Sequence, residues 1–294
     1  MRPVAKKAKN RGAFTIVELL TVMSIIVILI GLLVPALNKA RRYATYVKQK
    51  AMLHSMDAAI ELFNNEYGGY PPSTGLDDSP AATPYCGAMK LCEALMGQDL
   101  LGFHSISVFR ANGLDSTGTI QLYPPLPIQD NLRARKGPYL AAESANAFPM
   151  ENIYGASKVA PFLPKSYVLC DVYDRQMASG MKTGMPILYY KANTANNLHD
   201  PNLAPTITDA KGNIYNYWDN QQLVNLGKPW ESGGQTTAHA LANPQRFYRN
   251  TQNHMIQTAK QPYRSDEYIL LSAGWDGEYG TADDIFNFEW KYRQ

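Results

Sequence analysis

A long apolar run near the start dominates the hydrophobic pattern of this chain. Residues 14–37 make up 24 positions, and no charged residue lies from Leu19 to Asn38. At about 1.5 Å of rise per residue, a helix of this length spans the roughly 30 Å hydrocarbon core of a bilayer. The pattern therefore predicts a transmembrane helix over residues 14–37.

A second apolar pattern with helical spacing follows the membrane run. Its members recur three or four positions apart at Met52, Met56, Ala59, Ile60 and Phe63. Such a stripe is typical of a helix that packs one face on a sheet, so residues 38–67 should continue the helix outside the membrane. Two glycines and two prolines within residues 68–72 predict its end, because glycine favours a turn and proline supplies no amide donor.

The rest of the chain has weaker periodicity. A short helix is predicted over residues 88–95, and strands are predicted over residues 166–173 and 186–191. We expect an α+β fold in which the long N-terminal helix packs on a C-terminal antiparallel sheet. Residues 68–262 would form a large irregular insertion, and residues 263–294 a final strand and loop.

Charge is distributed unevenly along the chain. Residues 1–13 hold five Lys and Arg and no acid, so removing them from a chain of net charge +3 leaves −2. By the positive-inside rule the basic end stays in the cytoplasm, and the remainder lies outside. No basic stripe or recognised nucleic-acid motif follows, so no nucleic-acid partner is expected.

Glu18 interrupts the apolar run. An ionised carboxylate inside a bilayer costs several kcal/mol, and such residues usually have a function and an identifiable partner. A plain signal anchor would give this residue no role. The position of Glu18 therefore predicts a cationic partner.

The order of a basic leader, Gly12-Ala13 and then Phe14-Thr15-Ile16-Val17-Glu18 resembles the class III signal of type IV prepilins and type II secretion pseudopilins. The resemblance implies that a prepilin peptidase cuts between Ala13 and Phe14 and methylates the new amine of Phe14. It also implies that Glu18, at mature position five, pairs with the N-terminal amine of a neighbouring subunit. Opposite charges attract strongly in a medium of low dielectric constant.

The cleavage position has an alternative. The family usually has Gly directly before the cut, whereas here Ala13 stands there and Gly12 lies one position earlier. A cut after Gly12 would move Glu18 to position six and out of register with the amine. A cut after Ala13 places Pro35 at mature position 22, where pilins commonly carry a helix-kinking proline. We therefore expect the cut after Ala13.

The C-terminal segment resembles the calcium loop of major pseudopilins, in which Ser-x-Gly-x-Asp-Gly leads to Asp-Asp-Ile. The resemblance implies calcium as a cofactor, held by the side chains of Asp276, Asp283 and Asp284 and by a carbonyl near Leu271. Calcium takes six to eight oxygen ligands in flexible geometry, which suits a loop rich in acids and glycines. Asp side chains that cap the turns of their own loop are the alternative interpretation.

Cysteine and histidine give little evidence of other chemistry. An oxidising compartment would permit one disulfide bond among Cys86, Cys92 and Cys170, with Cys86 to Cys92 the easiest loop to close. The sequence does not fix the connectivity, and one thiol would remain. The five histidines have no zinc-ligand spacing.

Two enzyme-like strings lack the context that they need. Tyr154 and Lys158 match a dehydrogenase pair, but no glycine-rich dinucleotide loop accompanies them. Residues 179–184 overlap two motifs that come from different walls of a penicillin-binding site. We do not expect an enzyme.

The sequence predicts a structural pilin-like subunit of a type II secretion system or a related type IV pilus-like filament. It would span the bacterial inner membrane once, with a cytoplasmic N-terminus and a periplasmic C-terminal domain. Its expected partners are the prepilin peptidase, other pilin or pseudopilin subunits and the inner-membrane secretion platform. The alternative is a membrane-anchored binding or enzymatic domain that uses a pilin-like signal.

Overall fold

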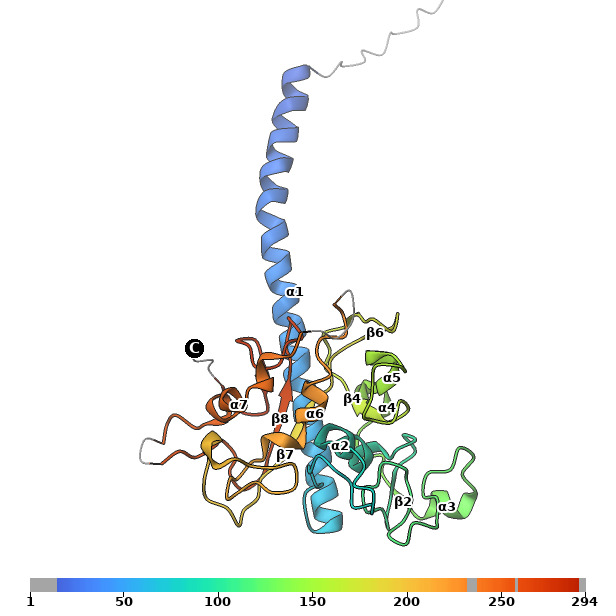
Figure 1. Cartoon of the computed structure of the whole chain (residues 1–294). Helices are drawn as coiled ribbons and strands as arrows, with labels where there is room; N and C mark the ends of the chain where they lie inside the picture. Colours follow the sequence, from blue (N-terminus) through green and yellow to red (C-terminus); the bar gives the residue numbers. More distant parts are fainter. Residues whose placement is uncertain (1–14, 232–236, 257–258, 291–294) are drawn as a thin grey trace, which may run out of the picture. The chain divides into compact units, whose positions relative to one another are not determined.

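The computed structural model describes residues 15–231, 237–256 and 259–290 of the 294-residue chain (Figure 1). Two compact units make up the chain, one ending at Tyr46 and the other beginning at Val47. The helix α1, Ile16–Tyr67, contributes residues to both units.

The first unit contains the N-terminal part of α1. Large apolar side chains are exposed along it from Ile16 to Leu37. Among the described residues, α1 is the one helix that is long and apolar enough to cross a bilayer. A helix that is apolar on every side suits a surrounding of lipid or of other helices. This finding agrees with the predicted membrane span.

A three-stranded antiparallel sheet forms the centre of the second unit. Its strands are β7 (Leu188–Lys191), β8 (Tyr268–Ser272) and β9 (Ile285–Phe286), in the order β7-β8-β9. In the register, Leu188 lies opposite Leu271, which in turn lies opposite Phe286. All five residues of β8 are buried, because β8 is the middle strand and its two faces are both covered.

The second half of α1 packs on one face of this sheet. The predicted apolar stripe is buried, and Met56 and Ile60 have no exposed surface. They share a core cluster with Ile187, Tyr189, Tyr268, Leu270 and Ile285. Asp57 adds polar contacts, since its Oδ1 accepts hydrogen bonds from Tyr268 Oη at 2.9 Å and Asn287 Nδ2 at 3.0 Å.

The helix α2, Gly87–Met96, is buried along its whole length and lies beside β7 and β4 (Tyr167–Leu169). Its side chains enter both core clusters, with Met89 in one and Leu91 in the other. Successive side chains of a strand point to opposite faces of the sheet, so the side chains of β7 and β8 are also divided between the two clusters. Tyr190 and Ile269, for example, belong to the cluster on the face opposite α1.

Side chains occupy the outer edge of β7. Asn220 Nδ2 donates to the carbonyl oxygen of Tyr189 at 2.7 Å, and Lys191 N donates to Ser73 Oγ at 3.0 Å. Asn220 Oδ1 also accepts from Ala88 N at 2.9 Å, which ties this edge to the start of α2. These bonds satisfy backbone groups that a neighbouring strand would otherwise pair.

Short elements complete the second unit. Three further antiparallel pairs are β1 (Phe103–His104) with β2 (Arg135–Lys136), β3 (Ala147–Pro149) with β4, and β5 (Arg175–Gln176) with β6 (Lys182–Thr183). The remaining helices are α3 (Gln129–Arg133), α4 (Ala142–Ala145), α5 (Met150–Tyr154), α6 (Gln221–Val224) and α7 (Pro244–Thr251), with 3-10 turns at Pro201–Leu203, Tyr217–Asp219 and Ala240–Ala242.

The α+β class, with a long helix on an antiparallel sheet, is confirmed. Residues 68–262 supply β7, so this region builds part of the sheet on which α1 packs. The predicted strands and the short helix also form, although β4 covers only three residues in the first half of its predicted range.

The suggested Cys86 to Cys92 bridge is wrong, because the three cysteines are free and buried. Cys86 precedes α2 and Cys92 lies within it, six residues later. They therefore point into different core clusters.

Candidate functional site

The start of α1 holds Glu18 in a capping box. Glu18 Oε2 accepts hydrogen bonds from Thr15 N and Thr15 Oγ1, both at 2.9 Å, and Glu18 N donates to Thr15 Oγ1 at 3.2 Å. In such a box the first polar residue and an acid three positions later satisfy each other's unpaired amides. Thr-x-x-Glu before an apolar run is the sequence signature of a capping box, so this contact could have been predicted from the sequence.

The capping box points the Glu18 carboxylate toward the beginning of the helix, where the helix dipole favours a negative charge. Gly12, Ala13 and Phe14 lie outside the described residues, so the cut between Ala13 and Phe14 stays a prediction. The carboxylate binds the amide of Thr15, the residue that directly follows the proposed new N-terminus. Chemically, this arrangement can present one negative charge near a terminal amine.

Pro35 lies inside α1, which continues to Tyr67 without interruption. Proline has no amide hydrogen, and its ring crowds the carbonyl four residues earlier. That earlier residue is Gly31, around which there is open space at the position of a side chain. Pro35 therefore removes one hydrogen bond from the helix backbone, and Gly31, which has no side chain, leaves space for the backbone to shift around the proline ring.

The loop between β8 and β9 contains the three predicted calcium ligands. Asp276 N donates to Asp283 Oδ2 at 2.8 Å, and Asp276 Oδ1 accepts from Glu278 N at 2.7 Å. Gly274 makes this fold possible, because its φ is +68° and a Cβ there would lie 2.0 Å from the carbonyl oxygen of Asp283. The loop thus has Asp side chains that bond its own amides, as the alternative interpretation expects.

Two carboxyl groups of the loop are in surroundings that disfavour their ionised forms. Burial raises the pKa of Asp276 to about 6, and the neighbouring Asp283 carboxylate adds to the increase. Asp284 is buried, which raises its pKa well above the usual value. Its Oδ2 accepts from Gly280 N at 2.8 Å, whereas its buried Oδ1 has no hydrogen-bond partner among the described residues. A cation near these groups would relieve this cost.

The loop does not bring its three acids into an assembled metal site. Within the part of the chain that the structure describes, no three His, Cys, Asp or Glu side chains form a group that could hold a metal ion. Leu271 lies inside the sheet, paired with Leu188 and Phe286, and is fully buried. The unpaired Oδ1 of Asp284 fits a cation, and calcium binding stays a prediction.

Arg175 supports the same loop from β5. Its Nη1 and Nη2 donate to the carbonyl oxygens of Asp276 and Trp275, each at 2.6 Å. Its guanidinium also lies 4.4 Å from the ring centre of Trp230. Nothing in the sequence links Arg175 to a loop about 100 residues later. Its contribution was therefore missed.

Asp171 anchors the beginning of the loop. Its Oδ2 accepts a hydrogen bond from Ser272 Oγ at 3.0 Å, and Ser272 Oγ accepts from Gly274 N at 3.2 Å. Its Oδ1 accepts from Met185 N at 3.1 Å and Tyr173 N at 3.2 Å. Burial raises the pKa of Asp171 to about 7. A carboxyl group from residues 68–262 thus connects that region to the C-terminal strand.

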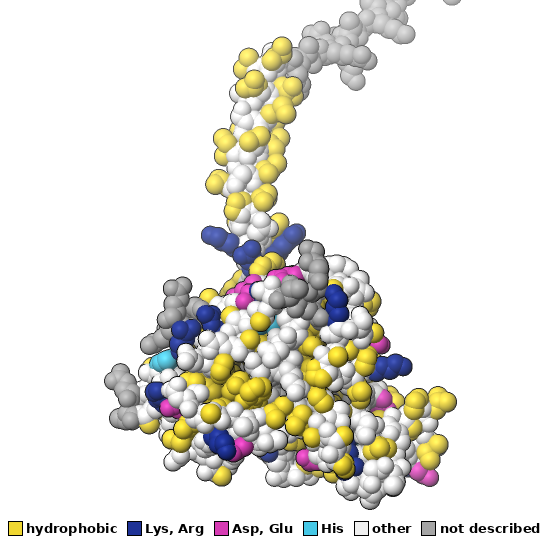
Figure 2. Space-filling view, in the orientation of Figure 1, with side chains coloured by type: hydrophobic (Ala, Val, Ile, Leu, Met, Phe, Trp, Pro, Cys, Tyr) yellow, Lys and Arg dark blue, Asp and Glu magenta, His cyan; other side chains and the backbone are white. Residues whose placement is uncertain are grey.

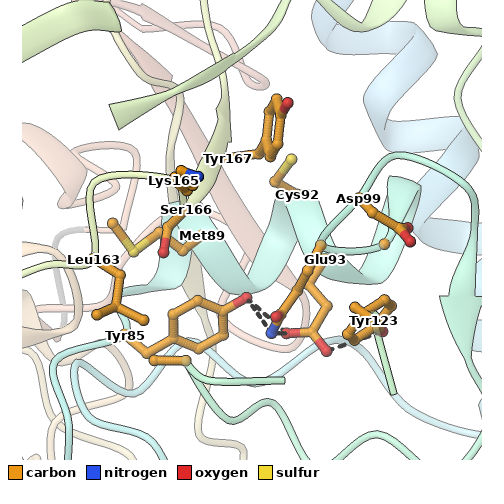
Figure 3. A pocket seen from close by; sticks show the side chains of 13 residues that line it. Tyr85, Met89, Cys92, Glu93, Asp99, Tyr123, Leu163, Lys165, Ser166 and Tyr167 are labelled. Atoms are coloured by element: carbon orange, nitrogen blue, oxygen red, sulfur yellow. Dashed lines mark hydrogen bonds between the residues drawn. The ribbon is translucent and has the colours of Figure 1, made fainter. Parts of the chain in front are cut away.

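A separate cavity of about 180 Å³ lies against α2 and contains the buried carboxyl group of Glu93 (Figure 3). Glu93 accepts hydrogen bonds from Tyr85 Oη at 2.6 Å, Gln98 Nε2 at 3.0 Å, Ser107 Oγ at 2.5 Å and Tyr123 Oη at 3.1 Å. Burial raises its pKa. Four donors already bond the two oxygens of this carboxyl group. We therefore interpret Glu93 as part of an internal hydrogen-bond network and not as a binding group.

The dehydrogenase-like pair has an unsuitable setting. Tyr154 is fully buried in the core, and Lys158 lies on the surface. These two residues therefore do not form the shared site that dehydrogenase chemistry needs.

Comparison with protein-family models, with curated proteins and with solved structures gives no match to this chain. The architecture of a long apolar N-terminal helix followed by a sheet-containing domain is consistent with that of a pilin-like protein.

Proposed function

We propose that this chain is a structural subunit of a pilin-like filament, either a pseudopilin of a type II secretion system or a subunit of a related type IV pilus-like assembly. The observation that carries the proposal is the start of α1, where Glu18 heads an exposed apolar helix of membrane length. The sheet-containing unit that follows supplies the globular part that such subunits present outside the membrane.

In this proposal the precursor spans the inner membrane once, and the prepilin peptidase removes residues 1–13 on the cytoplasmic side. The amine of Phe14 then pairs with Glu18 of an adjacent subunit, while the apolar surface from Ile16 to Leu37 packs against neighbouring helices. Pairing offsets the cost of an ionised carboxylate in lipid, and it fixes the axial position of one helix against the next. The inner-membrane secretion platform would deliver subunits to the filament.

Calcium is the proposed cofactor of the C-terminal loop. Asp276, Asp283 and Asp284 would hold it, and a carbonyl near Leu271 would complete the oxygen shell. Support comes from the buried Oδ1 of Asp284, which no donor among the described residues contacts, and from the raised pKa of Asp276. The ion would supply positive charge where carboxylates now lie close to one another.

The test separates the charge of Glu18 from its capping role. Glu18→Gln removes the charge and keeps an oxygen that can accept from Thr15 N, because glutamine serves in capping boxes as glutamate does. Thr15→Val removes the hydroxyl of the cap and keeps the charge. We expect both variants to insert into the membrane. Filaments, counted by electron microscopy after co-expression with the assembly machinery, should be lost with Glu18→Gln and should persist with Thr15→Val.

The mature N-terminus gives an independent readout. Mass spectrometry should find a chain that begins with methylated Phe14. A chain that keeps residues 1–13, together with normal filament yield in Glu18→Gln, would contradict the proposal. That result would favour a membrane-anchored binding domain that uses a pilin-like signal.

A further inference from the structure

Basic and aromatic side chains surround α1 just beyond its membrane-length segment. We call Lys39, Arg41, Arg42, Tyr43 and Tyr46 the basic collar. All five are exposed in the first unit, and Tyr43 retains 70% of its accessible surface. Figure 2 shows the dark-blue side chains gathered on the helix directly after its yellow segment.

The basic collar has charge on two opposite faces of the helix. Lys39, Arg42, Tyr43 and Tyr46 follow the spacing i, i+3, i+4, i+7 and share one face, and Arg41 lies on the opposite face. No acidic residue occurs in α1 between Glu18 and Asp57.

The depth of the basic collar matches the headgroup layer of a bilayer. Lys39 and Arg42 follow Leu37 by two and five residues, which is about 3 Å and 7.5 Å along a helix. The headgroup region extends about 5–8 Å beyond the hydrocarbon core on each side. Tyr43 follows Leu37 by six residues, about 9 Å along a helix, just past the outer boundary of this layer, and tyrosine is enriched at membrane interfaces.

We propose that the basic collar binds the phosphate groups of anionic phospholipids in the leaflet opposite the leader. Arginine forms paired hydrogen bonds with phosphate, and lysine contributes a compact positive charge. The inference rests on the membrane-spanning part of the proposed function and does not require filament assembly. Removal of the leader would leave this group as the basic flank of the span.

This contact would also set the depth of Glu18. Glu18 precedes Lys39 by 21 residues, or about 32 Å along a helix. When the basic collar lies in one headgroup layer, Glu18 lies near the opposite boundary of the roughly 30 Å core. The lipid contact would therefore hold the carboxylate at the membrane side where the leader is removed.

The experiment measures lipid selectivity in full-length protein at one copy per nanodisc. The discs contain phosphatidylcholine and a trace of spin-labelled phosphatidylglycerol or spin-labelled phosphatidylcholine. Electron paramagnetic resonance gives the fraction of each labelled lipid that the protein immobilises. The variant Lys39→Gln, Arg41→Gln, Arg42→Gln removes three charges, and glutamine keeps the helix because its propensity is similar. The matched control, Lys165→Gln, Lys182→Gln, Lys260→Gln, removes three exposed charges from the second unit.

We expect the collar variant to lose selectivity for phosphatidylglycerol by about fivefold for each Lys or Arg removed, and the control to match the wild type. The leader cations are the same in all three proteins, so this loss reports on the basic collar. A collar variant that keeps the wild-type selectivity, or that loses no more than the control, would overturn the inference. Circular dichroism in the same discs verifies that the helix remains. Because each disc holds one copy, failure of subunit pairing at Glu18 leaves the result unchanged.

Discussion

Replacing Asp171 by Asn isolates the electrostatic cost of a buried carboxyl group beneath the C-terminal loop. Burial raises the pKa of Asp171 from 3.8 to about 7. Asp171 therefore binds a proton more tightly in the native protein than in the unfolded chain, so its contribution to stability is highest below pH 4 and falls as the pH rises toward 7. A difference of about three pKa units corresponds to roughly 4 kcal/mol of lost stability above pH 7.

Asparagine preserves most of the hydrogen bonds at this position. Its Oδ1 can accept from Met185 N and Tyr173 N as the carboxylate does, and its amide can donate to Ser272 Oγ. We allow about 1–2 kcal/mol for imperfect geometry. The variant should therefore be about 2–3 kcal/mol more stable than the wild type at pH 8, and slightly less stable at pH 4.

Urea unfolding of the full chain in a non-denaturing detergent, followed by tryptophan fluorescence at pH 4 and pH 8, measures this difference. Asp174→Asn is the control, because Asp174 is exposed nearby. Some pH dependence should remain, since burial also raises the pKa of Asp219 to about 7. An Asp171→Asn variant that loses equal stability at both pH values would refute the electrostatic reasoning.

Three further predictions concern the core and the loop. Met56→Ala should destabilise the protein by about 2–5 kcal/mol in the same unfolding assay because Met56 is fully buried, whereas exposed His54→Ala should have little effect. Gly274→Ala should cost more than about 2 kcal/mol, since its Cβ would overlap the Asp283 carbonyl; a neutral result in urea unfolding would contradict the loop geometry. If calcium binds, its effect on the melting temperature should be full above pH 7 and decline below the Asp276 pKa of about 6. An equal calcium effect at pH 5 and pH 8 would argue against these ligands.

The long helix α1 and the short helix α2 were predictable because their signals are local. The apolar stripe at Met52, Met56 and Ile60 follows the turn of one helix, and the structure buries it as the spacing indicates. The strand at residues 268–272 was also visible, since β8 is a continuous apolar run.

The supports of the C-terminal loop were not predictable, because they come from distant parts of the chain. Arg175 and Asp171 contact the loop across about 100 residues, and neither belongs to a recognisable motif. Glu18 differs from both. Its pairing with Thr15 is local and follows the Thr-x-x-Glu spacing, so this contact was predictable from the sequence.

The occupied edge of β7 limits how copies of this chain can associate. Because Asn220 and Ser73 already bond Tyr189 and Lys191, an incoming strand would have to displace both side chains before it could extend the sheet. At the opposite edge, β9 offers only two residues. Short or covered edges protect proteins from amyloid-like and domain-swapped aggregation. A crowded array of these domains can therefore keep each sheet separate from its neighbours.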